Sequence, residues 1–385
     1  MSRMADLAQV EDQDHRDFRR SLRAYLEQRL PVSRVRELVV DGEDVGDATQ
    51  RRALWRHLCG ELGVAGLCVP EQYGGQGAPS TYEAVVMEEL GRSLAPLPMI
   101  STAVLTVAAL LAADDEDACR RWLPPIARGD LVATVAAAER PHDWDLQAIE
   151  TTAVWNGAQW RITGTKPWVV DGDCADVVLV LAGTEDGPGL LAVDLTDETV
   201  RREAGATLDP TRPVAVLRFV DAPAELVGAL GRGRDILDAS FRRAAVALGA
   251  EQLGVAARAL EMAVDHATQR VQFGRPIGSF QAIKHLLADR YVEIEGLRAS
   301  VRHAARALDD DPEQVPLLAH LCQAVGSEAA LEAAGATIQV HGGIGFTWDH
   351  DAHLYFKRAT VSRQWFGTPE HHRDKVAALM LGATA

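Results

Sequence analysis

Two short segments in the last third of the chain carry residue types that could bind the phosphates of a nucleotide. Arg270 begins the run Arg-Val-Gln-Phe-Gly-Arg-Pro-Ile, and its guanidinium offers a fixed fork of donors that suits a pyrophosphate. Further on, Gly342 and Gly343 allow close backbone approach and supply amide donors to a phosphate. Gln339 can bond a ribose or adenine edge, and Phe273 offers an apolar face to a nucleotide ring. Taken singly, each segment also fits an ordinary turn or helix end.

Long helices must position these segments. Helical spacing predicts helices over residues 236–270, 280–308 and 316–340, and their short connections predict an antiparallel four-helix bundle. The first third of the chain also predicts helices, among them 14–30 and 101–113.

The middle of the chain has a different texture. Short β-branched runs separated by turn signals predict an antiparallel β domain. We therefore expect an α+β chain with an N-terminal helical domain over 1–129, a middle antiparallel β-barrel domain over 130–231 and a C-terminal four-helix bundle over 232–385.

Composition limits the classes of function. A hydrophobic share of 47% in 385 residues excludes a largely disordered chain. The net charge of −16 repels nucleic acid and anionic membranes, so we expect neither as a partner. The longest apolar stretch, 97–113, is too short and too polar to span a bilayer. Five scattered cysteines without a CxxC pair, and an N-terminus without an apolar signal core, predict a cytoplasmic protein with no metal site.

Four motifs in order along the chain carry a family resemblance. They are Gly-Val-Ala-Gly-Leu-Cys-Val-Pro-Glu-Gln-Tyr-Gly-Gly-Gln-Gly with the Glu-Glu-Leu-Gly at 88–91, Ile-Thr-Gly-Thr-Lys-Pro-Trp at 162–168, the Arg270 run with Phe280-Gln281, and Gln-Val-His-Gly-Gly-Ile-Gly-Phe at 339–346. Together they resemble the acyl-CoA dehydrogenase family over nearly the whole chain. The order of helical, β and helical domains is the one that this resemblance implies.

The resemblance implies FAD as cofactor and an acyl-CoA or other acyl thioester as substrate. It places Trp168 beside the flavin ring and makes Thr368 a further cofactor contact. In this family a second group of residues reaches across a subunit interface to the neighbour's FAD, so it implies a dimer or tetramer, with either a second copy or a paralogous dehydrogenase chain. In this sequence that group is Arg270, Phe273, Gln281, Gln339, Gly342 and Gly343.

The usual catalytic base is missing. The family carries a Glu in a Tyr-Glu-Gly-Thr-like segment, and here the segment is Trp-Phe-Gly-Thr with Phe366 at the base position. Some relatives place the base on the first long helix, near Ala244 in this chain, and that position is also empty. Glu251 lies two turns further on the same helical face, so it is a candidate replacement base. The alternative is that Glu251 is a buried, paired carboxylate.

The segments that would hold the chain's own flavin also depart from the family pattern. Ala138 and Val170 replace residues that usually offer a hydroxyl, and Trp144 stands where a small residue is usual. Three functions stay open: an acyl-CoA dehydrogenase, a non-catalytic partner subunit that completes a neighbour's FAD site, and a flavin enzyme with altered, oxygenase-type chemistry.

Overall fold

The computed structural model describes residues 13–40, 48–141 and 143–382, which form two compact units. Unit 1 comprises residues 1–36, 80–95 and 245–385, and unit 2 comprises 37–79 and 96–244. The predicted N-terminal helical region is therefore shared between the units, because its helices pack on different neighbours. The three-domain division at 129 and 231 follows the sequence and stays a prediction.

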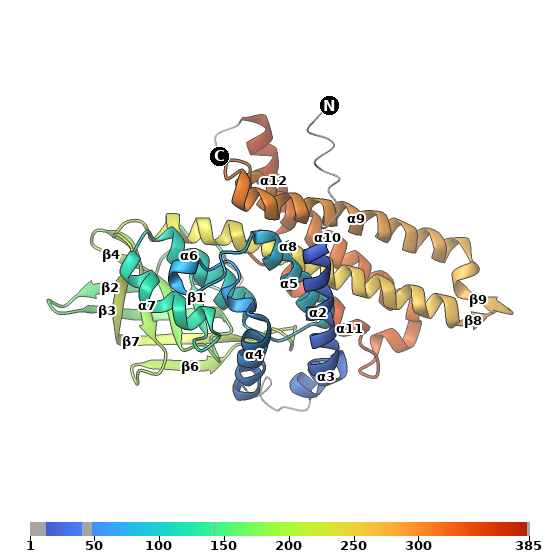
Figure 1. Cartoon of the computed structure of the whole chain (residues 1–385), viewed down its shortest axis with the longest axis horizontal. Coiled ribbons are helices and arrows are strands. Elements are labelled where there is room, and N and C mark those ends of the chain that lie inside the picture. The colour runs from blue at the N-terminus through green and yellow to red at the C-terminus, as the bar shows by residue number, and fades with distance from the viewer. Residues whose placement is uncertain (1–12, 41–47, 142, 383–385) are drawn as a thin grey trace. The chain divides into compact units, whose positions relative to one another are not determined.

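Unit 1 is built from helices, and its three longest elements extend close to the predicted bounds (Figure 1). Helix α8 belongs to unit 1 from residue 245 onward. Short 3₁₀ turns follow the β8–β9 hairpin and helix α10. The elements are α2 (Gln13–Arg29), α3 (Val32–Val40, which continues into unit 2), α5 (Ser80–Ser93), α8 (Gly233–Gln269), β8 (Val271–Gln272), β9 (Arg275–Pro276), η4 (Ile277–Ser279), α9 (Gln281–Asp310), α10 (Val315–His341), η5 (Gly342–Phe346), α11 (Ala352–Ser362) and α12 (Pro369–Leu381).

Two glycines let α5 and α8 approach each other at backbone distance. A Cβ atom on Gly254 of α8 would lie 1.9 Å from the Glu88 carbonyl oxygen, and one on Gly91 of α5 would lie 2.2 Å from the Glu251 carbonyl oxygen. Both distances are far inside van der Waals contact, so each helix requires a residue without a side chain at the crossing. The crossing places the backbone of Glu251 directly against α5.

Replacing Gly254 by Ala should destabilise unit 1, because backbone atoms on both helices would have to move. We expect a loss of about 1–3 kcal/mol or more in the free energy of unfolding. The matched control is Gly296→Ala on α9, where nothing lies within 4 Å of the added Cβ. That change should stabilise by about 0.5–1 kcal/mol through helix propensity. Urea titrations of both variants measure the difference; equal midpoints would contradict the close crossing.

Unit 2 contains a closed β-barrel flanked by helices. The ring β4–β2–β3–β7–β5 closes where β5 pairs again with β4, and β1 and β6 add to β4 and β7. The barrel predicted from the β-branched runs is thus confirmed. The elements are α4 (Ala48–Leu62), η1 (Val64–Gly66), η2 (Glu71–Tyr73), η3 (Met99–Thr106), α6 (Val107–Ala112), α7 (Glu116–Ala127), β1 (Ala133–Ala136), β2 (Thr152–Trp155), β3 (Trp160–Val170), β4 (Val177–Thr184), β5 (Gly187–Asp194), β6 (Val200–Ala204) and β7 (Val214–Val227).

The β domain is mainly antiparallel, as expected, but two of its strand pairs are parallel. Strand β1 pairs with β4 in parallel from Ala133–Val177 to Ala136–Val180, and β2 touches β4 in parallel at Thr152–Gly183. Parallel pairing needs a long connection, and the segments between these strands supply one. The alternation of apolar and polar residues within one strand does not indicate whether the neighbouring strand runs parallel or antiparallel to it.

The helix expected over 101–113 begins differently. Residues Met99–Thr106 form a π-helix, which continues as α6, and every residue of the π-helix is buried. The hydroxyl of Thr106 donates to the Ser101 carbonyl five residues earlier, which satisfies a backbone acceptor. The Ser101 hydroxyl in turn donates to the Asp171 carboxylate, just after β3, at 2.7 Å. Hydrophobic periodicity did not predict this π-helix. Such helices are rare, and those that occur are concentrated at functional sites.

Candidate functional site

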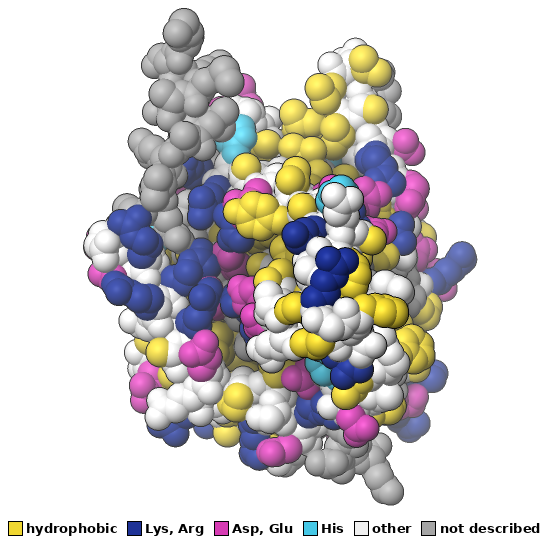
Figure 2. Space-filling view, turned by 90° about the vertical axis from the view of Figure 1, so that its right-hand side faces the viewer, with side chains coloured by type: hydrophobic (Ala, Val, Ile, Leu, Met, Phe, Trp, Pro, Cys, Tyr) yellow, Lys and Arg dark blue, Asp and Glu magenta, His cyan; other side chains and the backbone are white. Residues whose placement is uncertain are grey.

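A small apolar cluster joins the ends of three helices in unit 1. Ala263 and Ala267 of α8 and Val340 of α10 are buried together, and side chains from η4 and the start of α9 pack on them. This packing brings six residues predicted from the sequence to one end of the helical unit (Figure 1). Figure 2 looks onto that end, where apolar and basic side chains lie beside one another around the β8–β9 hairpin. The six are Arg270, Phe273, Gln281, Gln339, Gly342 and Gly343, and all are exposed.

The β8–β9 hairpin presents an aromatic ring to the exterior. Its two turn residues, Phe273 and Gly274, have φ of 52° and 74°. A two-residue turn with both φ values positive matches the twist of the strands, but for Phe it costs about 1–3 kcal/mol. Phe273 is 92% exposed, and its ring makes an edge contact with that of Phe280, with centroids 6.1 Å apart. A strained, exposed aromatic residue is suited to a contact with another molecule.

The glycine turn after α10 leaves open space beside its backbone. Gly342 ends α10 with φ of 64°, and its amide donates to the carbonyls of Gln339 and Ile338. A Cβ atom on Gly342 or Gly343 would meet nothing within 4 Å. His341 Nδ1 donates to the Thr337 carbonyl at 2.8 Å, and its ring lies in tilted contact with those of His266 and His350. The turn is therefore fixed to α10 and allows another molecule to approach its backbone closely.

The residues at this end fit the pyrophosphate and nucleotide half of FAD. The Cβ positions of Gly342 and Gly343 face open space, and no carboxylate of the described chain forms an ion pair with the Arg270 guanidinium. An exposed ring, an exposed amide side chain and a free guanidinium are the donors and faces that such a ligand uses. The assignment of these residues to a cofactor site stays a prediction.

In unit 2, Trp168 lies on β3 and is buried, at 6% exposed. Its strand is tied to the segment after β1 by a buried ion pair, in which the Lys166 ammonium lies 2.6 Å from the Glu139 carboxylate. Lys166 also donates to the Ala137 carbonyl, and Thr151 donates to Glu139 from a third segment. Sequence reasoning missed Lys166, although it stands inside the Ile-Thr-Gly-Thr-Lys-Pro-Trp motif. Its role is to hold residues 137–139 against β3.

In unit 2, the positions that depart from the family pattern carry apolar side chains. Ala138 and Val170 are buried, and neither offers a hydroxyl. Trp144 packs edge-on against Phe241 at 5.5 Å, and the Arg234 guanidinium donates to the carbonyls of Leu146 and Gln147. The 143–147 segment is therefore fastened to the N-terminal part of α8. These residues offer a flavin fewer hydrogen bonds than the family pattern does.

Glu251, the candidate base, lies in the buried centre of unit 1. Its carboxylate is 2.6 Å from the guanidinium of Arg358 on α11, and both side chains are almost fully buried. A buried ion pair persists because either charge would be strongly destabilising if it were left in the interior without its partner. The structure therefore places Glu251 in the paired arrangement that was the alternative to a base. Its partner Arg358 was not predicted, because 107 residues separate the two.

The segment at the family's base position is held tightly in unit 1. Phe366 has φ of 60° and is buried, and Trp365 is fully buried beside it. Thr368 caps helix α12, since its hydroxyl accepts from the His371 amide at 3.2 Å. His372 lies under Gly367, and its Nδ1 is 2.9 Å from that of His320, so one ring donates a hydrogen bond to the other. The segment presents an aromatic side chain where the family has a carboxylate.

The buried histidine under this segment makes stability pH-dependent. Burial, with the charges of His320 and His371, lowers the pKa of His372 to about 3, from 6.5 in the unfolded chain. Between these values the unfolded chain binds a proton that the folded chain does not, so stability falls as pH falls. We expect up to about 1.4 kcal/mol per pH unit from this residue. Urea midpoints between pH 7 and 5 should decline less steeply in His372→Gln than in a control with the exposed His57→Gln.

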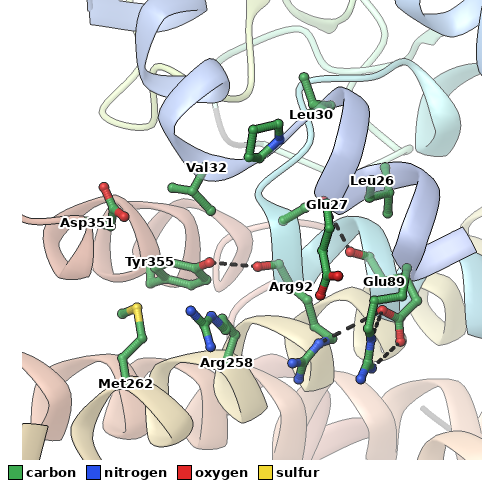
Figure 3. Close-up of a pocket in the computed structure, with 13 residues that line it drawn as sticks. Leu26, Glu27, Leu30, Val32, Glu89, Arg92, Arg258, Met262, Asp351 and Tyr355 are labelled. Carbon is green, nitrogen blue, oxygen red and sulfur yellow. Dashed lines mark hydrogen bonds and ion pairs between the residues drawn. The ribbon is translucent and has the colours of Figure 1, made fainter. Parts of the chain in front are cut away.

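A cavity of about 300 Å³ lies elsewhere in unit 1 (Figure 3). The Tyr355 hydroxyl donates to the Arg92 carbonyl at 2.6 Å, and Arg23 makes a two-point contact with Glu89. Arg92 makes a similar contact with Glu261. The charged groups around the cavity are thus largely engaged with one another, and none of the site residues predicted from the sequence lines it. It is a seam that joins α2, α5, α8 and α11.

Comparison with known proteins agrees with this fold. The acyl-CoA dehydrogenase N-terminal domain model matches residues 12–130, and the C-terminal domain model matches 231–381. Acyl-CoA dehydrogenase IpdE2 of Mycobacterium tuberculosis is 38% identical over 82% of this chain and 83% of its own. The ChsE4–ChsE5 complex from the same species has a chain with 29% identity and a TM-score of 0.85, covering 98% of this chain and 99% of that one. The Tcur3481–Tcur3483 steroid acyl-CoA dehydrogenase variant has 31% identity and a TM-score of 0.83, covering 96% and 98%.

The chain belongs to the acyl-CoA dehydrogenase family. It is an oxidoreductase whose cofactor is FAD and whose reaction is the α,β-dehydrogenation of an acyl-CoA thioester. The relatives are dehydrogenases, which favours this function over oxygenase-type chemistry. No helix among the described residues is long and apolar enough to cross a membrane.

Proposed function

We propose that this chain dehydrogenates an acyl-CoA as one subunit of a mixed oligomer, in which a paralogous acyl-CoA dehydrogenase chain supplies the catalytic base. The observation that carries the proposal is that, among the residues that the structure describes, none of the positions considered for the base offers an unpaired carboxylate. Phe366 and Ala244 occupy the two positions where the family places its base, and Glu251 is paired with Arg358 in the interior. A base contributes about 10²–10⁴-fold in rate, so an enzyme of this class needs one from another source.

The surface at the end of unit 1 supports the choice of a partner. The donors on this surface point outward from the chain. A surface that binds the pyrophosphate half of FAD in this way would complete an FAD site in a neighbouring chain. Arg270 would bond the pyrophosphate, the Gly343 amide a phosphate oxygen, and Gln339 the ribose or adenine edge, while Gly342 would allow the phosphate to approach closely. Phe273 would cover a nucleotide ring and Gln281 would bond near it.

The chain's own flavin side has lost several of the family's polar contacts. Trp168 would still flank the ring, held by Lys166 and Glu139, and Thr368 would approach it as in the family pattern. The hydroxyls replaced by Ala138 and Val170 would be absent. When bound, FAD accepts the hydride from the β-carbon. We propose that the productive flavin lies in the partner's cleft and is completed by this chain.

We further propose that the acyl group carries a ring system. The Tcur3481–Tcur3483 relative is described as a steroid acyl-CoA dehydrogenase, and another relative as a cyclohex-1-ene-1-carbonyl-CoA dehydrogenase. We propose that the buried, hydroxyl-rich π-helix Met99–Thr106 contributes to substrate selection. A cytoplasmic location is proposed because all five cysteines are free thiols, as a reducing compartment maintains them.

The proposal is tested by expressing the chain alone and together with each paralogous chain of its source organism that has Glu at the position of Phe366. We expect the chain alone to be colourless and inactive, and one pair to be yellow and active. In that pair Arg270→Ala should weaken FAD binding by about 10–100-fold, because a charged hydrogen bond is lost. The control Arg302→Ala removes an equally exposed guanidinium from α9 and should change nothing. Full FAD content and activity in the lone chain would refute the proposal.

A further inference from the structure

Three histidine rings from separate parts of unit 1 are packed together in one cluster, which comprises His266, His341 and His350. The ring of His341, the last residue of α10, contacts both of the others, with centroids 4.2 Å from His266 and 4.3 Å from His350. His266 belongs to the last turn of α8, and His350 precedes α11. His341 is buried, whereas His266 and His350 are partly exposed. The cluster therefore joins three helix ends and remains accessible from outside.

The histidine cluster adjoins both segments that are predicted to bind phosphate. The Arg270 amide donates to the His266 carbonyl at 2.9 Å, so the two side chains are one helical turn apart on the same face. His341 is bonded directly to Gly342, the first residue of the glycine turn. A phosphate held between the Arg270 guanidinium and the glycine turn would therefore lie beside the cluster.

Hydrogen bonds fix two of the three rings and leave the third available to a ligand. His341 donates from Nδ1 to the Thr337 carbonyl at 2.8 Å, which holds that ring on α10. His350 accepts from the Ala352 amide at Nδ1 over 3.1 Å, so the ring is neutral with its proton on Nε2. Neither ring nitrogen of His266 is hydrogen-bonded within the described part of the chain. His266 is therefore the member of the cluster that can bond an incoming group.

The surroundings of His266 disfavour a charge on its ring while no anion is bound. Burial lowers the pKa of His266, and His341, Arg270 and His350 lower it further. These three neighbours are all basic, so the ring is neutral at pH 7. An anion beside Arg270 would act in the opposite direction, because a nearby negative charge favours the protonated ring.

The acidic group that acts on the cluster is directed at another ring. The Asp351 carboxylate raises the pKa of His350, but burial and His341 outweigh it and the net shift is downward. Asp351 also lies 2.9 Å from the Arg36 guanidinium, which lowers the pKa of His350. A negative charge for His266 must therefore come from a bound molecule.

We propose that His266 is a further phosphate-binding residue, which takes up a proton as the diphosphate of the dinucleotide binds beside Arg270 and the glycine turn. The inference rests on the proposed function and adds a proton to the cofactor site that it describes. The protonated ring would donate to a phosphate oxygen. Its charge and that of Arg270 would together offset the dianion, in a chain whose net charge of −16 otherwise repels it.

The test follows the release of FAD from the yellow pair identified by co-expression, as the rise in flavin fluorescence after dilution at pH 6 and at pH 8. In the unmodified pair, release should be about tenfold slower at pH 6, because a proton is linked to binding. His266→Phe keeps a ring in the cluster but cannot take up the proton, so release should be equally fast at both pH values. His266→Lys stays charged throughout, so release should be equally slow at both.

The control His57→Gln changes a histidine of α4 in unit 2 and should keep the pH dependence of the unmodified pair. Calorimetric titration of FAD into the flavin-stripped pair gives a second readout. A proton taken up on binding makes the measured heat depend on the ionisation enthalpy of the buffer, and His266→Phe should remove that dependence. Far-ultraviolet circular dichroism and the urea midpoint of each lone variant verify the fold.

The outcomes separate this inference from the proposed function. If the lone chain is yellow, the mixed-pair proposal fails, and the same release measurement on the lone chain still tests His266. If the pair is yellow and His266→Phe releases FAD with the pH dependence of the unmodified pair, the His266 inference is overturned while the proposed function stands. If neither the lone chain nor any pair binds FAD, both are overturned.

Discussion

Replacing Arg358 by Met should cost the protein about 3–5 kcal/mol in the free energy of unfolding, because the Glu251 carboxylate would remain buried without its counter-ion. The pair is 2.6 Å apart, and both side chains are under 5% exposed. Water cannot reach the remaining carboxylate, so it must either stay charged at high cost or take up a proton. Urea titration of the full chain at pH 7 measures the loss.

The double variant Glu251→Leu with Arg358→Met is the matched control. It removes both charges and leaves side chains of similar size, so most of the lost stability should return. The single variant should also regain stability as pH falls toward the pKa of the lone carboxyl, whereas the double variant should not. A single variant as stable as the unmodified chain would show that the ion pair is not what secures Glu251.

Removing the partner's carboxylate, and not one of this chain, should abolish dehydrogenation. In the active pair, changing the partner's Glu at the position of Phe366 to Gln should lower kcat by about 10²–10⁴-fold. Phe366→Leu in this chain should leave kcat within about threefold, since a phenyl ring takes no proton. Rates are measured with acyl-CoA substrate and an artificial electron acceptor.

Glu251→Gln decides between its two interpretations in the same assay. If Glu251 only pairs with Arg358, the folded pair keeps its kcat and its kcat–pH profile, and the stability of this chain alone decreases. If Glu251 is the base, kcat falls by the same large factor and the acidic limb of the pH profile disappears. That second result would identify Glu251 as the catalytic base, as the sequence suggested. It would contradict the proposal that the partner supplies the base.

Local patterns predicted much of the architecture. Helical spacing placed α8, α9 and α10 within about three residues of their observed ends, since long amphipathic or apolar repeats leave one way to bury a face. The β-branched runs placed the strands of the barrel. The parallel direction of β1 could not be predicted from the sequence, because it depends on which distant strand β1 pairs with. The π-helix at Met99–Thr106 was also missed, because its extra residue is stabilised by hydroxyl contacts with segments remote in sequence.

The sequence by itself determined the family and the cofactor, since motifs of Gly, Arg, Gln and aromatic residues carry their chemistry in their types and order. It also identified the six residues later found together at the end of unit 1, and it predicted that the usual base is missing. Only the tertiary structure showed that Glu251 is buried and paired with Arg358, because 107 residues separate the two and burial exists only once helices pack.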